Sequence, residues 1–129
     1  MRPILDEQHI HPAVRDKVAT LHAGIVKEVR EAIAANAIVV VGMRQNPRVM
    51  IARRALEAAK LPYQYLEYGS YLSQWRRRNA LKMWTGWPTF PMIFIKGTLI
   101  GGYENLKALN ESGELAAAVR GAPALNAPP

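Results

Sequence analysis

Hydrophobic and polar residues follow two different periods along this 129-residue chain, and the periods divide it into helices and strands. From Pro12 to about Ala35 apolar residues recur every three or four positions with charges between them, which predicts one amphipathic helix. Ala37 to Gly42 is continuously apolar and β-branched, which predicts a central strand buried on both faces. After a short polar loop, residues 48–60 return to helical spacing, so the chain opens as an α/β unit.

The second half of the chain continues to alternate strand and helix patterns. Two short apolar runs are separated by Lys96-Gly97, a turn sequence, and a last helix follows Gly101-Gly102 with a break expected at Gly113. Residues 121–129 are rich in alanine and proline, so we expect a disordered tail there. The patterns predict strands at 63–68, 92–95 and 98–101, and helices at 71–84 and 102–119.

Composition narrows the class of protein. Lys and Arg number 17 against 10 Asp and Glu, and the net charge of +7 favours anionic partners without naming one. No apolar run approaches the ~20 residues that span a bilayer, and the N-terminus lacks a signal-peptide pattern, so we expect a cytoplasmic protein without a membrane partner. The length fits one domain. We predict an N-terminal extension at 1–24, a domain at 25–119 and a tail at 120–129.

The chain contains no cysteine. These residues therefore form no disulfide, supply no thiolate nucleophile and offer a metal no thiolate ligand. His9 and His11 would share one face of an extended segment, but His22 belongs to a different predicted element. We expect surface histidines and no metal site.

The most distinctive stretch runs from Trp87 to Ile95 and reads Trp-Pro-Thr-Phe-Pro followed by an apolar strand. Pro91 has no N–H to donate, so it belongs at the first position of the strand or in an entry turn, and its peptide bond is a candidate for the cis form. With Lys96-Gly97 and Gly101-Gly102, this stretch resembles the second half of a glutaredoxin, closest to the monothiol type. The resemblance covers about residues 25–119. It implies the α/β thioredoxin-like fold, a four-stranded mixed sheet flanked by helices, with an extra N-terminal helix here.

The resemblance also implies a groove for glutathione, because in glutaredoxins the loop around this proline binds that tripeptide. Asn46 and Pro47, at the start of a predicted helix, stand where the family carries Cys-Pro, so the proline is kept and the nucleophile is lost. The helix N-terminus should still attract anions. Arg78 matches an arginine that binds a glutathione carboxylate, and Phe90 would pair its backbone with the cysteinyl unit. The implied groove residues are Arg44 (in place of a family lysine), Asn46, Arg78, Thr89, Phe90, Pro91, Gly102, Tyr103 and Glu104.

Three classes of function fit these observations. A non-catalytic module that binds glutathione, a thiol peptide or another small anion, in a regulatory or scaffold role, fits a groove without its nucleophile. A redox or iron–sulfur protein would need a partner that supplies the thiol. A binder of single-stranded nucleic acid or acidic proteins fits Arg76 to Arg78 beside Trp75 and Trp84, though nothing else matches a nucleic-acid module.

The sequence favours the first class, with glutathione as a ligand and no intrinsic cofactor. The alternative is a vestigial groove, in which Trp87, Pro88 and Pro91 serve packing alone. The sequence leaves this choice open.

Overall fold

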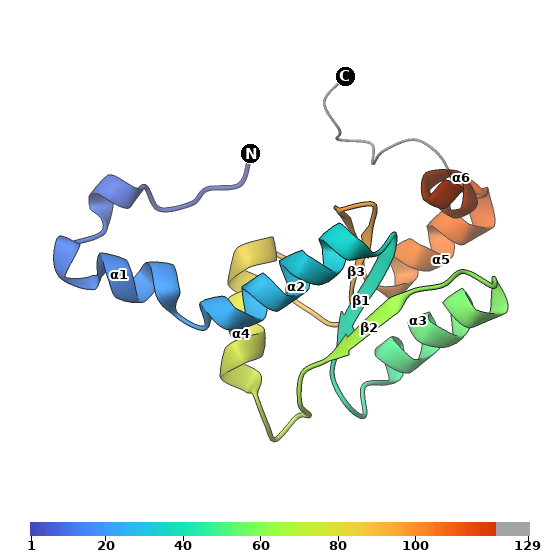
Figure 1. Cartoon of the computed structure of the whole chain (residues 1–129), viewed down its shortest axis with the longest axis horizontal. Coiled ribbons are helices and arrows are strands. Elements are labelled where there is room, and N and C mark those ends of the chain that lie inside the picture. Colours follow the sequence, from blue (N-terminus) through green and yellow to red (C-terminus); the bar gives the residue numbers. More distant parts are fainter. Residues whose placement is uncertain (121–129) are drawn as a thin grey trace.

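A mixed four-stranded sheet forms the centre of the molecule, in a computed structural model that describes residues 1–120 (Figure 1). The strand order is β2-β1-β3-β4. β1 pairs parallel to β2 and antiparallel to β3, and β3 pairs antiparallel to β4. The predicted disordered tail at 121–129 lies outside the described residues. The strands are β1 (Ile38–Gly42), β2 (Gln64–Glu67), β3 (Met92–Ile95) and β4 (Thr98–Gly101).

Helices cover both faces of this sheet. One face is packed by α2 and α4, and the other by α3, α5 and α6. Within the part of the chain that the structure describes, no helix has the length and apolarity needed to cross a bilayer. The helices are α1 (Pro12–Thr20), α2 (Ala23–Ala35), α3 (Pro47–Ala58), α4 (Trp75–Thr85), α5 (Tyr103–Ser112) and α6 (Glu114–Arg120), and a short 3-10 helix, η1 (Glu7–His9), precedes α1.

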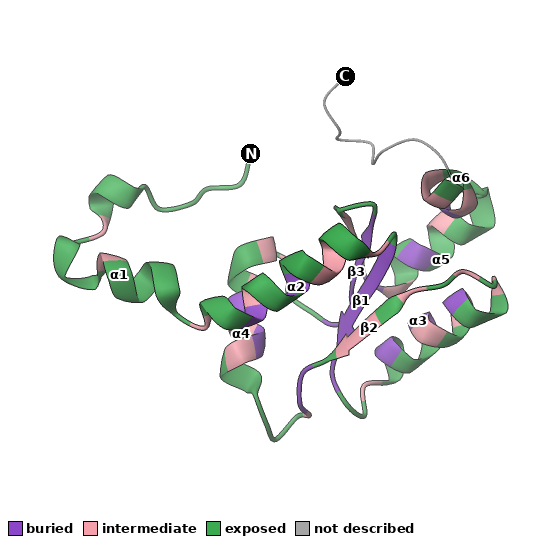
Figure 2. Ribbon diagram, viewed as in Figure 1, coloured by how far each residue is buried: buried purple, intermediate pink, exposed green. Residues whose placement is uncertain are grey.

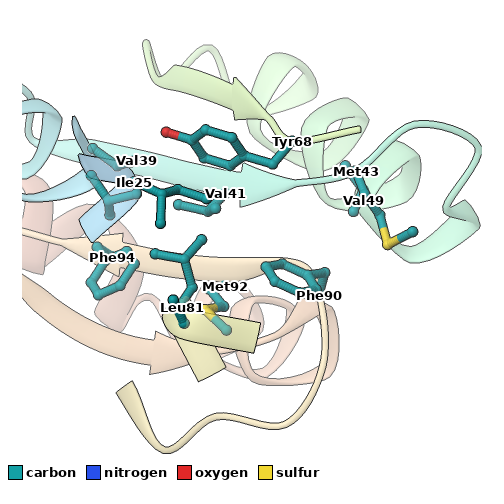
Figure 3. Close-up of a cluster of buried hydrophobic side chains, with 12 residues drawn as sticks. Ile25, Val39, Val41, Met43, Val49, Tyr68, Leu81, Phe90, Met92 and Phe94 are labelled. Atoms are coloured by element: carbon teal, nitrogen blue, oxygen red, sulfur yellow. The ribbon is translucent and has the colours of Figure 1, made fainter. Parts of the chain in front are cut away.

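The central strand is apolar throughout because it is buried on both faces, as its sequence predicted (Figure 2). Successive side chains of a strand point to opposite faces, so β1 contributes to two separate cores. Val39 and Val41 pack with α2 and α4, in the cluster that Figure 3 shows. Ile38 and Val40 pack with α3, α5 and α6.

The single helix predicted from Pro12 to Ala35 is wrong, because the structure breaks it into α1 and α2. His22 lies at the break with a φ of 49°. The amphipathic pattern continues through the break, yet α1 contains no buried residue, and Val14 and Val18 are 44% and 56% exposed. Figure 1 shows why: α1 extends away from the sheet, where it has no core to cover. It therefore does not cover an edge of the sheet.

Two other helix boundaries depend on local turns. The helix predicted from residue 71 begins only at Trp75, because Gln74 has a φ of 58° and the Ser70 N–H donates to Ser73 Oγ at 3.0 Å in the preceding turn. The break expected at Gly113 is confirmed. That residue ends α5 with a φ of +83°, a conformation that glycine adopts without the steric cost of a side chain.

Candidate functional site

A groove of about 420 Å³ lies where the first turns of α3 and α5 meet the loop before β3. This volume is within the usual range for sites that hold small molecules. Met43 and Phe90 line the groove and also belong to the core between the sheet and α2 and α4, so the groove rests on packed side chains (Figure 3). The structure brings together these predicted residues on its walls: Asn46, Thr89, Phe90, Pro91, Gly102, Tyr103 and Glu104.

Asn46 forms the N-cap of α3, with Pro47 in the first helical position, as the sequence predicted. Its side-chain Oδ1 accepts hydrogen bonds from the backbone N–H of Arg48 at 2.9 Å and of Val49 at 3.2 Å. These two N–H groups are therefore already satisfied by the protein. The anion-attracting helix end expected from the sequence is closed on one side by its own cap.

The loop between α4 and β3 is tied to the end of α4. Thr85 Oγ1 donates to the Leu81 carbonyl at 2.8 Å and accepts the Trp87 N–H at 3.1 Å. The Phe90–Pro91 peptide bond is cis. Trp87 Nε1 is buried and has no hydrogen-bond partner among the described residues, although an indole N–H normally finds one. Trp87 lines the groove, but its indole N–H is shielded from solvent.

Glycines form the wall at the start of α5. Asn105 Oδ1 accepts the Gly102 N–H at 3.1 Å, which secures the first turn of the helix. Gly101 has a φ of +111°, and a Cβ there would lie 2.5 Å from Asn105 Oδ1. A side chain at Gly101 would therefore displace the cap and the Trp87 ring beside it.

The charged side chains on the groove differ in how readily they can bind a ligand, because some are already paired within the protein. Arg48 and Glu104, from the first turns of α3 and α5, form an ion pair between two well-exposed side chains. Exposed pairs of this kind contribute about 1 kcal/mol or less, so a ligand can replace either partner at small cost. Lys82 Nζ lies 5.7 Å from the centre of the Phe90 ring and forms no ion pair within residues 1–120. The uncompensated charge on the groove is positive.

Arg44 and Arg78, the remaining predicted site residues, lie away from the groove walls. Arg44 Nε is 3.6 Å from the carboxylate of Glu67 on β2. Arg78 is buried, and its Nη1 donates to the carbonyls of Tyr68 at 2.8 Å and Ser73 at 2.6 Å. Burial lowers the pKa of the Arg78 guanidinium.

Six residues that line the groove were missing from the sequence-based set: Met43, Arg48, Lys82, Trp87, Pro88 and Asn105. Two of them carried a usable signal. Lys82 follows Arg78 by four residues, so a helix places both on one side. Asn105 stands three residues after Gly102, the spacing of a helix-capping pair.

Comparisons with known proteins point to the same family as the sequence motif between Trp87 and Gly102. The family model described as Glutaredoxin matches residues 38–100. A glutaredoxin-like protein from Dictyostelium discoideum is 47% identical over 91 residues, which are 70% of this chain and 74% of that protein. Monothiol glutaredoxin-S11 from Oryza sativa is 36% identical over 76 residues, 57% of this chain but only 15% of that much longer protein.

The fold matches a solved structure of a buckwheat glutaredoxin–glutathione complex. The TM-score is 0.65 over 76% of this chain and 89% of the other, at 20% sequence identity. At that identity the likeness concerns the fold alone.

Proposed function

The chain belongs to the glutaredoxin family, and from this premise we propose that it is a non-catalytic module that binds glutathione or a similar thiol peptide. Family membership would ordinarily suggest thiol–disulfide exchange, which requires a thiolate nucleophile. These 129 residues contain no cysteine. Binding without exchange, in a regulatory or scaffold role, is the function that uses what the site retains.

The observation that carries this proposal is the assembled groove. Segments far apart in the sequence meet there around a volume suited to a small ligand, and Lys82 on the wall has no paired carboxylate among residues 1–120. The buckwheat protein of the same fold was solved with glutathione bound.

The groove offers a distinct contact for each part of a γ-glutamyl tripeptide. The backbone of Phe90, before the cis proline, would pair with the central cysteinyl unit as one strand pairs with another. The first turn of α5 and Glu104 would hold the charged glutamyl end, since backbone N–H groups attract its carboxylate and Glu104 attracts its ammonium. Lys82 would attract a ligand carboxylate.

Titration with glutathione tests the proposal. We expect chemical-shift changes at Phe90, Gly102 and Tyr103 with millimolar reduced glutathione. Lys82→Ala should weaken binding about tenfold, because a hydrogen bond to a charged group contributes about 1.5–3 kcal/mol. Lys107→Ala removes the same charge from an exposed position of α5 and is the matched control. No shift changes in the wild-type protein would show that the groove is vestigial.

A nucleic-acid role has less support from the geometry. The Arg76 guanidinium lies 5.1 Å from the centre of the exposed Trp75 ring, an arrangement suited to stacking on a base. However, Arg77 is engaged with Gln74 and Glu28, and Arg78 is buried. The run of three arginines therefore does not form one continuous basic surface.

A further inference from the structure

The orientation of the Asn46 side chain determines what the groove presents at the start of α3. The oxygen of the carboxamide must face the helix, because it accepts the N–H groups of Arg48 and Val49. The other half of the group, Nδ2, carries two N–H donors and no acceptor. Nδ2 donates to no acceptor within residues 1–120, and Asn46 lines the groove. The free part of this side chain therefore offers a ligand hydrogen-bond donors and no acceptor.

The other groups on the groove reinforce this donor character. Lys82 adds a charge with no carboxylate paired to it in the described part of the chain. The one carboxylate on the walls, Glu104, is held by Arg48 and is carried by α5, whereas Asn46 belongs to α3. A ligand group beside Asn46 thus meets donors and a positive charge, an environment that stabilises an anion.

We propose that Asn46 makes this groove selective for glutathione whose sulfur carries a negative charge, as a thiolate or an oxidised sulfur acid. The inference rests on the proposed function, which sets the cysteinyl unit opposite Phe90, in the same groove as Asn46. In that arrangement Nδ2 is the donor that we assign to the ligand sulfur. A cysteine thiolate at position 46 would repel an anionic sulfur, whereas the asparagine amide donates to it. Where the family motif carries a thiol that reacts with the ligand sulfur, Asn46 offers an amide that can only form a hydrogen bond with it.

The chemistry of sulfur makes the selectivity measurable. A thioether is a weak hydrogen-bond acceptor, so it gains little from an N–H donor. A sulfonate offers charged oxygen acceptors, and hydrogen bonds to charged groups are about twice as strong as those between neutral groups. Glutathione sulfonate and S-methylglutathione share every other part of the tripeptide, so the ratio of their dissociation constants isolates the group at the sulfur.

Calorimetric titration of the full chain with these two ligands tests the inference. We expect the wild-type protein to bind the sulfonate about tenfold more tightly, as expected for one hydrogen bond to a charged group. Asn46→Ser keeps a capping oxygen and the net charge, but it replaces the two amide N–H donors, which extend beyond the capping oxygen, with a single O–H on the capping oxygen itself. This variant should lose most of the preference by weakening the sulfonate alone. Asn46→Asp also caps α3 but presents an acceptor and a negative charge, so it should reverse the preference.

The outcomes separate this inference from the proposed function. Equal affinity of the wild-type protein for the two ligands would overturn the selectivity and leave glutathione binding intact. A sulfonate preference that persists unchanged in Asn46→Ser would also overturn it, since the general positive potential of Lys82 and Arg48 would then be the cause. If the wild-type protein bound neither ligand, the proposed function itself would fail.

Discussion

Arg78 and Lys82 stand one helical turn apart on α4, and their surroundings give them different tasks. Arg78 points inward and joins α4 to the segment after β2 through two backbone carbonyls. Lys82 lines the groove. A family resemblance transfers a residue type to a position, but the nearest acceptors determine what its side chain does.

Arg78→Ala should therefore lower the free energy of unfolding by about 2–3 kcal/mol, because two charged hydrogen bonds are lost and the carbonyl of the buried Tyr68 loses its partner. Urea denaturation measures this change. Arg76→Ala, two residues earlier on α4 and exposed, should alter stability by about 0.5 kcal/mol or less. If Arg78→Ala had full stability but bound glutathione much more weakly, Arg78 would be a ligand residue after all, as its resemblance to the family implies.

At the scale of elements, the start of α3 combines a helix N-terminus with two nearby arginines. Arg44 precedes the cap and Arg48 follows it, and both are exposed. The positive charges of the two arginines and the partial positive charge of the helix end both favour an anion. Each arginine is paired with a solvent-accessible carboxylate, and such pairs cost little to break, so we expect the start of α3 to stabilise a thiolate placed at position 46.

Asn46→Cys should restore a reactive thiol. Its pKa should fall from ~8.5 toward the range of about 3.5–7.5 that is typical of cysteines at helix N-termini. The pH dependence of alkylation by iodoacetamide measures this value. Ala58→Cys is the matched control, because it places an exposed thiol at the opposite end of the same helix, where the partial charge is negative. Equal pKa values for the two thiols would show that the start of α3 does not stabilise an anion.

At the scale of the whole molecule, the N-terminal segment and the sheet domain differ in how they are held. α1 contributes no buried residue, and the segment before it is linked to α4 by a hydrogen bond from Arg2 to the Trp84 carbonyl at 3.2 Å. By contrast, α2 buries Ile25 and Val29 against the sheet. The stability of the fold therefore resides in residues from α2 onward.

Deletion of residues 1–21 should change the free energy of unfolding by less than about 1 kcal/mol, since exposed segments contribute little to stability. Deletion of residues 1–29 removes Ile25 and Val29 and should destabilise the protein by several times that amount, because each buried aliphatic side chain contributes about 1.5–3 kcal/mol. Thermal and urea denaturation of both variants check this. A large loss from the shorter deletion would mean that α1 packs on the domain in solution.

The sequence alone determined the fold and much of the groove. Its periodic patterns predicted the short strands at 92–95 and 98–101 with the bounds the structure has, and the motif from Trp87 to Gly102 predicted the family and the thioredoxin-like fold, both confirmed. The cap at Asn46 and the break at Gly113 were also predictable. These features depend on residues close together in the chain, so a local pattern carries them.

Only the tertiary structure decided which long side chains line the groove and which apolar faces are buried. Arg78 and Lys82 both have flexible stems, but the fold places backbone carbonyls around the Arg78 head group and leaves the Lys82 side chain on the groove. Val14 and Ile25 follow the same amphipathic pattern, yet Ile25 is buried and Val14 is exposed, because the sheet extends beneath α2 and not beneath α1. A pattern shows that a face can be buried, and the arrangement of distant segments determines whether another surface meets it.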